Sequence, residues 1–284
     1  MNYKILEFND EKYPEMLKRI KNPPKRIFYI GNIQLLNTVS VAVVGSRKTS
    51  DYGFWVASNV ARRLAENNVT VVGGMAKGID TFAHRAALKA GGNTIAVLGT
   101  GIDKCFPSEN KGLMDEIAKK GLIISEYPPG YPGDKWTFPQ RNRIISGISK
   151  AVIIGEAGLH SGALITAEWA EEQNKYLFAV PGNINNIRNI GNNKLISDGV
   201  MPLTVIDDIF EYIGVAPKEV DVEKIYLGND ERKVLEIIKQ HGELSINELC
   251  MKLEMKPSIV NGIVSILEIK GIANTSLGKI FIAK

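Results

Sequence analysis

Cysteine is scarce in this chain of 284 residues, and long apolar runs are missing. The two cysteines, Cys105 and Cys250, lie far apart in the sequence, which excludes a disulfide scaffold and a cysteine-rich zinc module. Apolar runs such as VAVV, TIAVL and AVII are much shorter than the roughly 20 residues that a membrane-spanning helix needs. We therefore expect a soluble, cytoplasmic protein that has no membrane partner.

A large charge of either sign is also missing. The 35 Lys and Arg residues against 31 Asp and Glu residues give a net charge of only +4. This balance excludes binding to nucleic acid through overall charge density, although it leaves room for a local basic patch. The first residues, MNYKILEFNDEKYPEM, have no apolar centre, so we expect no secretory signal.

Short runs rich in β-branched residues recur through the middle of the chain. They occupy residues 41–44, 69–72, 94–98, 122–124, 151–154 and 176–180. Each run is too uniformly apolar for a strand with one solvent face, so each predicts a strand buried on both faces. Helical patterns lie between the runs, as in 53–66, where Val56, Val60 and Leu64 recur every four residues. The alternation predicts an α/β fold with a mostly parallel sheet and helices on both faces.

The rest of the chain predicts a second, smaller domain. Residues 1–40 read as a short N-terminal extension, residues 41–213 as the sheet domain and residues 214–229, charged and without apolar periodicity, as a linker. Helical patterns at 230–240, 245–253 and 257–270 and a terminal hairpin with its turn at Gly278 then resemble a winged helix. One Arg and seven Lys against seven acidic residues give 230–284 a net charge of +1, so DNA reading and a protein-contact or autoregulatory role both stay open.

Glycines follow several of the predicted strands. They are Gly45, Gly73, Gly74, Gly99, Gly101, Gly155 and Gly182. In a doubly wound sheet, ligands bind where the carboxyl ends of the strands turn into helix N-termini, and glycine lets a phosphate approach the main chain closely. Each glycine alone is explained by a tight turn. Together they predict a phosphate-binding edge.

The first of these loops, residues 45–53, reads GSRKTSDYG. It fits neither the dinucleotide pattern GxGxxG nor the nucleotide pattern GxxxxGK[ST]. Ser46 and Arg47 place a hydroxyl and a guanidinium beside a helix N-terminus, which suits an anionic oxygen, whereas a surface salt bridge is the alternative. A later loop places Ser161 and Gly162 before a helix that carries Thr166, where a second phosphate site or a plain N-cap is predicted.

Basic and aromatic side chains alternate in one segment, residues 135–149: Lys135, Trp136, Phe138, Arg141 and Arg143. Cations for phosphates and rings for bases are what single-stranded nucleic acid binding needs. The alternative is that the rings are core anchors and that the arginines pair with Glu126 or Glu156. We assign Trp136 to the core, and leave Lys135 and Phe138 open on residue type alone.

Other reactive residues predict no chemistry. Asp80 and His84 share a helical face, but the chain holds only 3 His and offers no third ligand at a convincing spacing, so we predict a structural contact between them and no metal site. Cys105 reads as a small buried thiol rather than a nucleophile.

Taken in order, VGSRKTSDYG, GGMAKGIDTFAH, AVLGTGID, SEYPPG, FPQRNRIISGIS, SGALITA and FAVPGN resemble the DNA-processing protein A family, DprA, also called Smf, over about residues 12–205. The resemblance implies an extended Rossmann-like domain without a cofactor or enzymatic activity. It implies a homodimer that binds and protects single-stranded DNA and helps to load RecA recombinase on it during natural transformation and recombination. An N-terminal helical domain found in some relatives has no room before residue 41, and Phe106-Pro107 stands where the family often has Tyr-Pro.

The resemblance also selects binding residues. The family's DNA pocket uses the arginine of the GSR motif, here Arg47, and a lysine and a phenylalanine that fall on Lys135 and Phe138. The predicted DNA-binding set comprises Ser46, Arg47, Lys135, Phe138, Arg141, Ser161, Gly162 and Thr166.

Two other functions compete with this one. A Rossmann-like nucleotide phosphoribohydrolase carries PGGxGTxxE, with a glutamate three residues after the threonine. Here Trp169 stands three residues after Thr166, while Glu168 and Glu171 lie at other offsets, so the catalytic carboxylate is misplaced. A ligand-sensing regulator would use the winged helix to read an operator, which the +1 balance argues against.

Overall fold

The computed structural model describes residues 2–218, 227–276 and 278–282. The chain divides into two compact units, Met1–Lys218 and Glu219–Lys284. Each unit has a hydrophobic core of its own, so each is described by itself.

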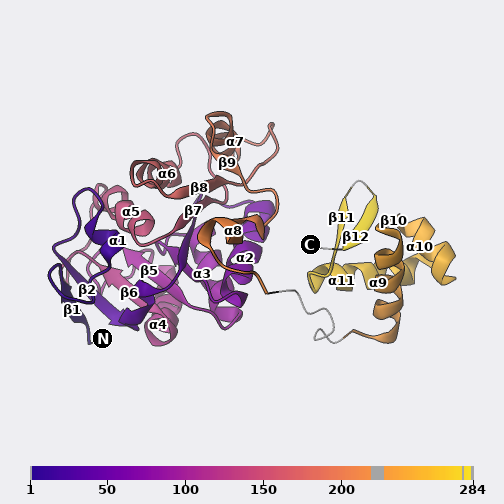
Figure 1. Cartoon of the computed structure of the whole chain (residues 1–284), viewed down its shortest axis with the longest axis horizontal. Coiled ribbons are helices and arrows are strands. Elements are labelled where there is room, and N and C mark those ends of the chain that lie inside the picture. Colours follow the sequence, from indigo (N-terminus) through magenta and orange to yellow (C-terminus); the bar gives the residue numbers. More distant parts are fainter. Residues whose placement is uncertain (1, 219–226, 277, 283–284) are drawn as a thin grey trace. The chain divides into compact units, whose positions relative to one another are not determined.

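A 9-stranded sheet forms the centre of the first unit (Figure 1). Its strands are β1 Lys4–Glu7, β2 Arg26–Gly31, β3 Ser40–Val44, β4 Thr70–Gly73, β5 Thr94–Leu98, β6 Leu122–Ser125, β7 Ala151–Ile154, β8 Tyr176–Ala179 and β9 Met201–Pro202. They lie in the order β1-β2-β6-β5-β4-β3-β7-β8-β9. All pairs from β6 to β9 are parallel, and β2 and β1 add antiparallel pairs at one edge. The predicted mostly parallel sheet is confirmed.

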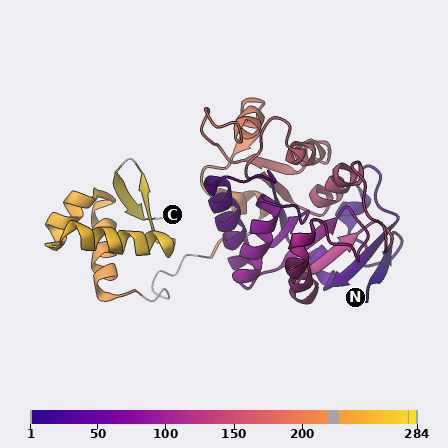
Figure 2. The same cartoon turned by 180° about the vertical axis from the view of Figure 1, so that it is seen from behind.

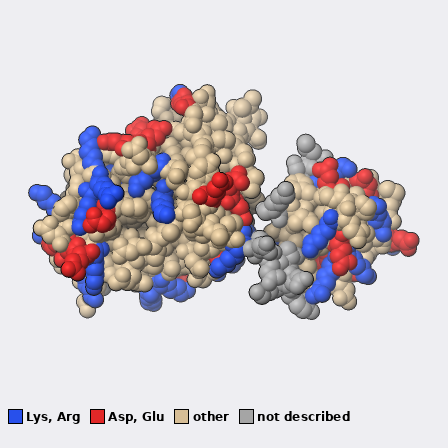
Figure 3. Space-filling view, viewed as in Figure 1, with Lys and Arg blue, Asp and Glu red and all other residues tan. Residues whose placement is uncertain are grey.

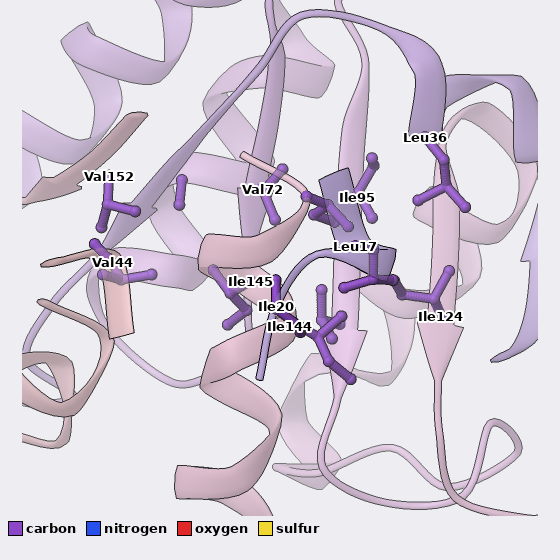
Figure 4. Close-up of a cluster of buried hydrophobic side chains, with 14 of the residues drawn as sticks. Leu17, Ile20, Leu36, Val44, Val72, Ile95, Ile124, Ile144, Ile145 and Val152 are labelled. Atoms are coloured by element: carbon purple, nitrogen blue, oxygen red, sulfur yellow. The ribbon is translucent and has the colours of Figure 1, made fainter. Parts of the chain in front are cut away.

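Helices cover both faces of this sheet (Figure 2). They are α1 Glu15–Lys18, α2 Asp51–Glu66, α3 Ile79–Lys89, α4 Lys111–Lys120, α5 Thr137–Gly147, α6 Gly162–Glu172, α7 Ile190–Ser197 and α8 Asp208–Ile213. Short 3-10 helices lie at Ile33–Asn37 and Ser108–Asn110. Ala42 and Val44 of β3 point into the cluster of Figure 4, which α1, α5 and α6 cover, whereas Val41 and Val43 point into the cluster that α2, α3 and α8 cover.

The first 40 residues belong to the sheet domain and are not an extension. β1 pairs with β2, and β2 pairs with β6. Tyr13, Leu17 and Ile20 are buried in the same cluster as α5. β1 is hard to recognise in the sequence because it is the edge strand: Leu6 alone is buried, so the strand shows no continuous apolar run. β2 lies between β1 and β6, and only Ile27 and Phe28 are buried in it.

The first unit also extends past the predicted boundary at residue 213. Val215 packs against the cluster beneath α8, and the backbone N–H of Lys218 donates to Oδ1 of Asn67 at 2.6 Å. Arg63 Nη2 in turn donates to the Lys218 carbonyl at 2.9 Å. The first residues of the predicted linker 214–229 are therefore fixed on α2, and its central part, 219–226, lies outside the described residues.

The second unit joins helices to a 3-stranded antiparallel sheet. Its elements are α9 Asn229–His241, β10 Glu243–Ser245, α10 Ile246–Leu253, α11 Pro257–Ile269, β11 Ala273–Ser276 and β12 Lys279–Ile282. The helices lie within a few residues of the predicted ones. The Ser245 side chain accepts from the backbone N–H of Glu248 at 3.3 Å, and the Glu248 carboxylate accepts from the backbone N–H of Ser245, a reciprocal cap that fixes the start of α10.

Candidate nucleic-acid interface

A cleft of about 1120 Å³ lies at the carboxyl ends of the parallel strands. The loops after β3, β4, β5, β6, β7 and β8 line it, together with α5 and the first turns of α6. All of the residues that the sequence predicted for DNA binding line this cleft: Ser46, Arg47, Lys135, Phe138, Arg141, Ser161, Gly162 and Thr166. Segments more than 100 residues apart in the sequence thus meet at one edge, as the switch-point rule for open α/β sheets predicts.

A buried carboxylate fixes the loop after β3. Glu156 is fully buried, and its carboxylate accepts from the backbone N–H of Ser50 at 2.9 Å and from the Ser50 hydroxyl at 2.5 Å. The Glu156 carbonyl accepts from the backbone N–H of Ser46 at 2.6 Å. Gly78 closes against the same loop, because a Cβ there would lie 2.2 Å from the Ser46 carbonyl oxygen. Glu156 thus fixes both ends of the loop, while Arg47 within it is exposed.

Arg141 forms the floor of the cleft, and its predicted contact with DNA stays a prediction. The side chain is 5% exposed, and its Nη1 donates to the carbonyls of Gly74, at 2.7 Å, and of Val97. A Cβ on Gly74 would lie 2.4 Å from the guanidinium, so only glycine admits it. Its Nε donates to Oδ1 of Asn142 at 3.1 Å, so bonds within the protein hold the guanidinium in place. Burial lowers the pKa of Arg141 to about 10, so it stays charged at neutral pH beneath the cleft.

Asp80 lies beside this buried cation. Its carboxylate is 4% exposed and accepts from the backbone N–H of Gly74 at 2.6 Å. Burial raises the pKa of Asp80, and the charge of Arg141 opposes that effect. Asp80 therefore orders the loop after β4. It is buried, so it does not add a negative charge beside the exposed cations of the cleft.

The segment before α5 presents Lys135 and Phe138 to the cleft. Lys135 is exposed, and Phe138 is half-buried, with its ring centroid 5.1 Å from that of Phe106. Trp136 was predicted to lie in the core, which is wrong: it is 59% exposed, and its ring lies edge-on to that of Tyr127, with the centroids 6.2 Å apart. Trp136 is the last residue before α5, and the next residue, Thr137, is the one that is buried.

The alternative, in which an arginine of the segment pairs with Glu126, holds for Arg143. Its Nη1 and Nη2 donate to the two carboxylate oxygens of Glu126 at 2.7 and 2.6 Å. Such a two-pronged pair holds α5 against the segment after β6. Arg143 is accordingly structural, and the segment contributes Lys135, Phe138 and Arg141 to the cleft.

The loop after β7 carries the remaining predicted residues. The Ser161 hydroxyl accepts from the backbone N–H of Ala163 at 3.3 Å, so Ser161 is the N-cap of α6. Gly162 is exposed, and a Cβ there would meet nothing within 4 Å. Thr166 is 1% exposed and lines the inner wall. The N-cap alternative holds for Ser161, and the open main chain at Gly162 leaves room for an anion beside it.

Several lining residues carried no recognised sequence signal. They are Lys48, Phe106, Leu159, Ile187 and Arg188. Lys48 extends the GSR motif by one position, whereas Arg188 belongs to a stretch, NINNIRNI, without a pattern that predicts binding. Exposed cations thus come from three loops, as Arg47 and Lys48, Lys135, and Arg188. Elsewhere on the first unit basic and acidic side chains are interspersed on the face that Figure 3 shows.

The predicted contact between Asp80 and His84 is wrong, because each side chain hydrogen-bonds to another residue. His84 Nδ1 hydrogen-bonds to Oγ1 of Thr94 at 2.6 Å, and its Nε2 has no partner within the described structure. Both side chains are buried and structural. The part of the chain that is described holds no group of three or more His, Cys, Asp or Glu suited to a metal. Cys105 is half-buried, and its thiol donates to the Pro107 carbonyl at 3.2 Å.

Comparison with known proteins gives the family. The model of DNA recombination-mediator protein A matches residues 4–214. The chain belongs to this family. It is 46% identical over 200 residues to DNA processing protein DprA of Streptococcus pneumoniae, covering 70% of this chain and 71% of that one. It is 39% identical over 207 residues to DprA of Bacillus subtilis, covering 72% and 70%. The chain spans 55% of the Smf protein of Synechocystis, with 37% identity.

Solved structures of DprA share the fold of the first unit. The crystal structure of DprA from Streptococcus pneumoniae superposes with a TM-score of 0.71 and 44% identity over 74% of each chain. A DprA structure from Helicobacter pylori, which describes a single-stranded DNA binding mode of that protein, gives 0.68 and 33% identity over 74% of this chain and 94% of the other. Among the described residues, no helix is long and apolar enough to cross a membrane.

Proposed function

We propose that this DprA-family chain binds single-stranded DNA in the cleft at the carboxyl edge of its sheet. Arg47 and Lys135 hold backbone phosphates, and Phe138 stacks a base. The observation that carries the proposal is the assembly, in one cleft, of exposed cations from three loops around an accessible aromatic ring. Cations for the backbone and a ring for bases are the sequence-tolerant combination that single strands need.

A gel-shift comparison of single-stranded and duplex DNA of one sequence, at two salt concentrations, tests the proposal. We expect the full chain to bind the single strand more tightly, because a duplex keeps its bases stacked inward and offers no face to Phe138. Binding should weaken as salt rises, since each phosphate contact releases counterions. Equal or tighter binding of the duplex at both salt concentrations would reject the stacking role.

The finer role follows from the family. We infer that the chain protects incoming single strands and loads RecA recombinase on them, in natural transformation or general recombination, as a cytoplasmic homodimer. The description of the matching family, a recombination mediator, supports this role. The test is RecA filament assembly on single strands coated with a single-strand-binding protein. The chain should shorten the lag of assembly, and Arg47→Ala should not.

We expect no hydrolysis of nucleotides. The carboxylates that line the cleft in the described structure are Asp80 and Asp134. Asp80 is buried under backbone N–H groups, and Asp134 accepts from the Tyr131 hydroxyl, so neither is placed as a free general base. Incubation with nucleoside monophosphates should release no base above background. Release that Glu168→Gln abolishes would instead favour the phosphoribohydrolase.

We expect the second unit to contribute little to single-strand affinity. Its net charge is near zero, and α11, the helix that a winged helix would place on DNA, holds no Lys or Arg between residues 257 and 269. A chain ending at Lys218 keeps the contacts of Lys218 to α2 and should bind within about threefold of the full chain. A loss beyond tenfold, about 1.4 kcal/mol, would place the second unit in the main site.

A further inference from the structure

Three aromatic side chains, Tyr52, Phe54 and Trp55, stand exposed on the first turns of α2. Tyr52 is 43% and Trp55 is 48% exposed. Their rings are nearly parallel, with an interplanar angle of 9° and centroids 6.5 Å apart. Phe54, between them in sequence, instead packs edge-on against Phe82 at 4.8 Å. Tyr52 and Trp55 therefore form a stacked pair, the α2 pair, that no role described above uses.

The α2 pair lies on the helix that follows the cleft loop of Arg47, and one of its rings is bonded to the loop after β8. The Tyr52 hydroxyl donates to the Pro181 carbonyl at 2.9 Å. Pro181 begins the loop that carries Arg188 into the cleft, and the loop of Arg47 leads directly into α2. Tyr52 thus bridges two of the loops that supply exposed cations. The N-terminus of α2 is fixed in this position by the bonds of Ser50 to Glu156.

We propose that the α2 pair is a second stacking platform, which takes unpaired bases from a strand that runs out of the cleft past Arg47 and Arg188. The inference rests on the proposed function and extends the same site. Each exposed ring has a π-face for any base, so the platform is tolerant of sequence. Cations on the loops at either side favour a polyanion over an apolar protein partner. Asp51 is the acidic residue of this turn, and the strand passes beside it.

Strand length separates this platform from the cleft. A thymidine strand of about six nucleotides is within the site size of one binding domain, whereas one of about twenty extends beyond it. In the full chain, the double substitution of Tyr52→Ala with Trp55→Ala should leave affinity for the short strand unchanged. It should lower affinity for the long strand by about tenfold or more, because stacking on each ring is lost.

Two control variants define what the loss means. Phe54→Ala removes an exposed ring of the same helix that lies outside the α2 pair, so it should bind both strands as the wild type does. Tyr52→Phe keeps the ring and removes the hydrogen bond to Pro181, and it should retain long-strand affinity. If Tyr52→Phe loses as much as the double variant, the hydroxyl acts by holding the loop, and the stacking platform is rejected.

Tryptophan fluorescence gives a direct signal. The chain has 3 Trp, at positions 55, 136 and 169, so Trp136→Phe with Trp169→Phe leaves Trp55 as the sole reporter. The long strand should quench it, and the short strand should not. Quenching by neither strand, while Arg47→Ala still weakens binding of both, overturns the platform and leaves the proposed function standing. A chain that binds neither strand refutes the proposed function, and the inference with it.

Discussion

Arg47→Ala and Lys135→Ala should each weaken single-strand binding on every sequence tested and reduce its dependence on salt. Both side chains are exposed, and neither forms an ion pair within the described structure, so their charges are available to phosphates. Each lost phosphate contact should flatten the slope of log affinity against log salt by roughly 0.7. Titrations at several salt concentrations measure the slope. If Arg47→Ala has the wild-type affinity and slope, the phosphate site lies elsewhere.

Phe138→Ala should lose affinity without changing that slope. Stacking a base is worth roughly 1–3 kcal/mol and releases no counterion, so its removal lowers affinity equally at every salt concentration. Phe138 is half-buried, with its ring against Phe106 and against the backbone of Gly99, so it also packs. Phe138→Leu is the matched control, because it keeps apolar volume and removes the aromatic face.

Thermal melting decides how these results are interpreted. The Arg47 and Lys135 variants should melt near the wild type, because exposed cations without ion pairs add little stability. Complete loss of an aromatic core residue would cost about 3–5 kcal/mol. If Phe138→Ala unfolds the chain while Phe138→Leu folds and binds fully, Phe138 is a packing residue and not a stacking platform.

The strands of this sheet could be predicted where burial is symmetrical. β3, β5 and β7 lie between neighbouring strands and under helices on both faces, so every position is buried and an apolar run is visible in the sequence. β1 is the edge strand and buries only Leu6, and β2, which pairs with β1 and β6, is buried only at Ile27 and Phe28. The parallel centre of the sheet could therefore be predicted from the sequence, whereas its antiparallel edge was seen only in the structure.

The cleft could be predicted for a different reason. Parallel strands bring their carboxyl ends to one edge, so residues that follow strands meet whatever their separation in sequence. The role of each residue within the cleft was less predictable. The burial of Arg141 depends on carbonyls at the ends of β4 and β5, partners that no local pattern reveals. Arg188 is brought to the rim by the loop after β8 and carries no motif.

The first unit should lose stability as the pH falls below about 6.5, and His84 should be one cause. Its imidazole is fully buried, with Nδ1 bonded to Thr94. Burial, and then the nearby charge of Arg141, lower the pKa of His84 to about 3. In the unfolded chain the pKa of histidine is near 6.5, so between about pH 6.5 and 3 the unfolded state binds a proton that the native state excludes.

This difference in protonation should cost about 1.4 kcal/mol of unfolding free energy per pH unit, or about 2 kcal/mol at pH 5. Every tryptophan lies in the first unit, so fluorescence during denaturant unfolding of the full chain reports on it. His84→Gln cannot take up the proton. Between pH 7.5 and pH 5 the free energy of unfolding of the wild type should therefore fall by about 2 kcal/mol more than that of His84→Gln. His160→Gln, at an exposed histidine of the cleft, controls for the loss of an imidazole. A difference in unfolding free energy between wild type and His84→Gln that stays constant with pH would contradict this prediction. It would mean that His84 takes up its proton in the folded chain at the same pH as in the unfolded chain, and that neither burial nor the charge of Arg141 lowers its pKa.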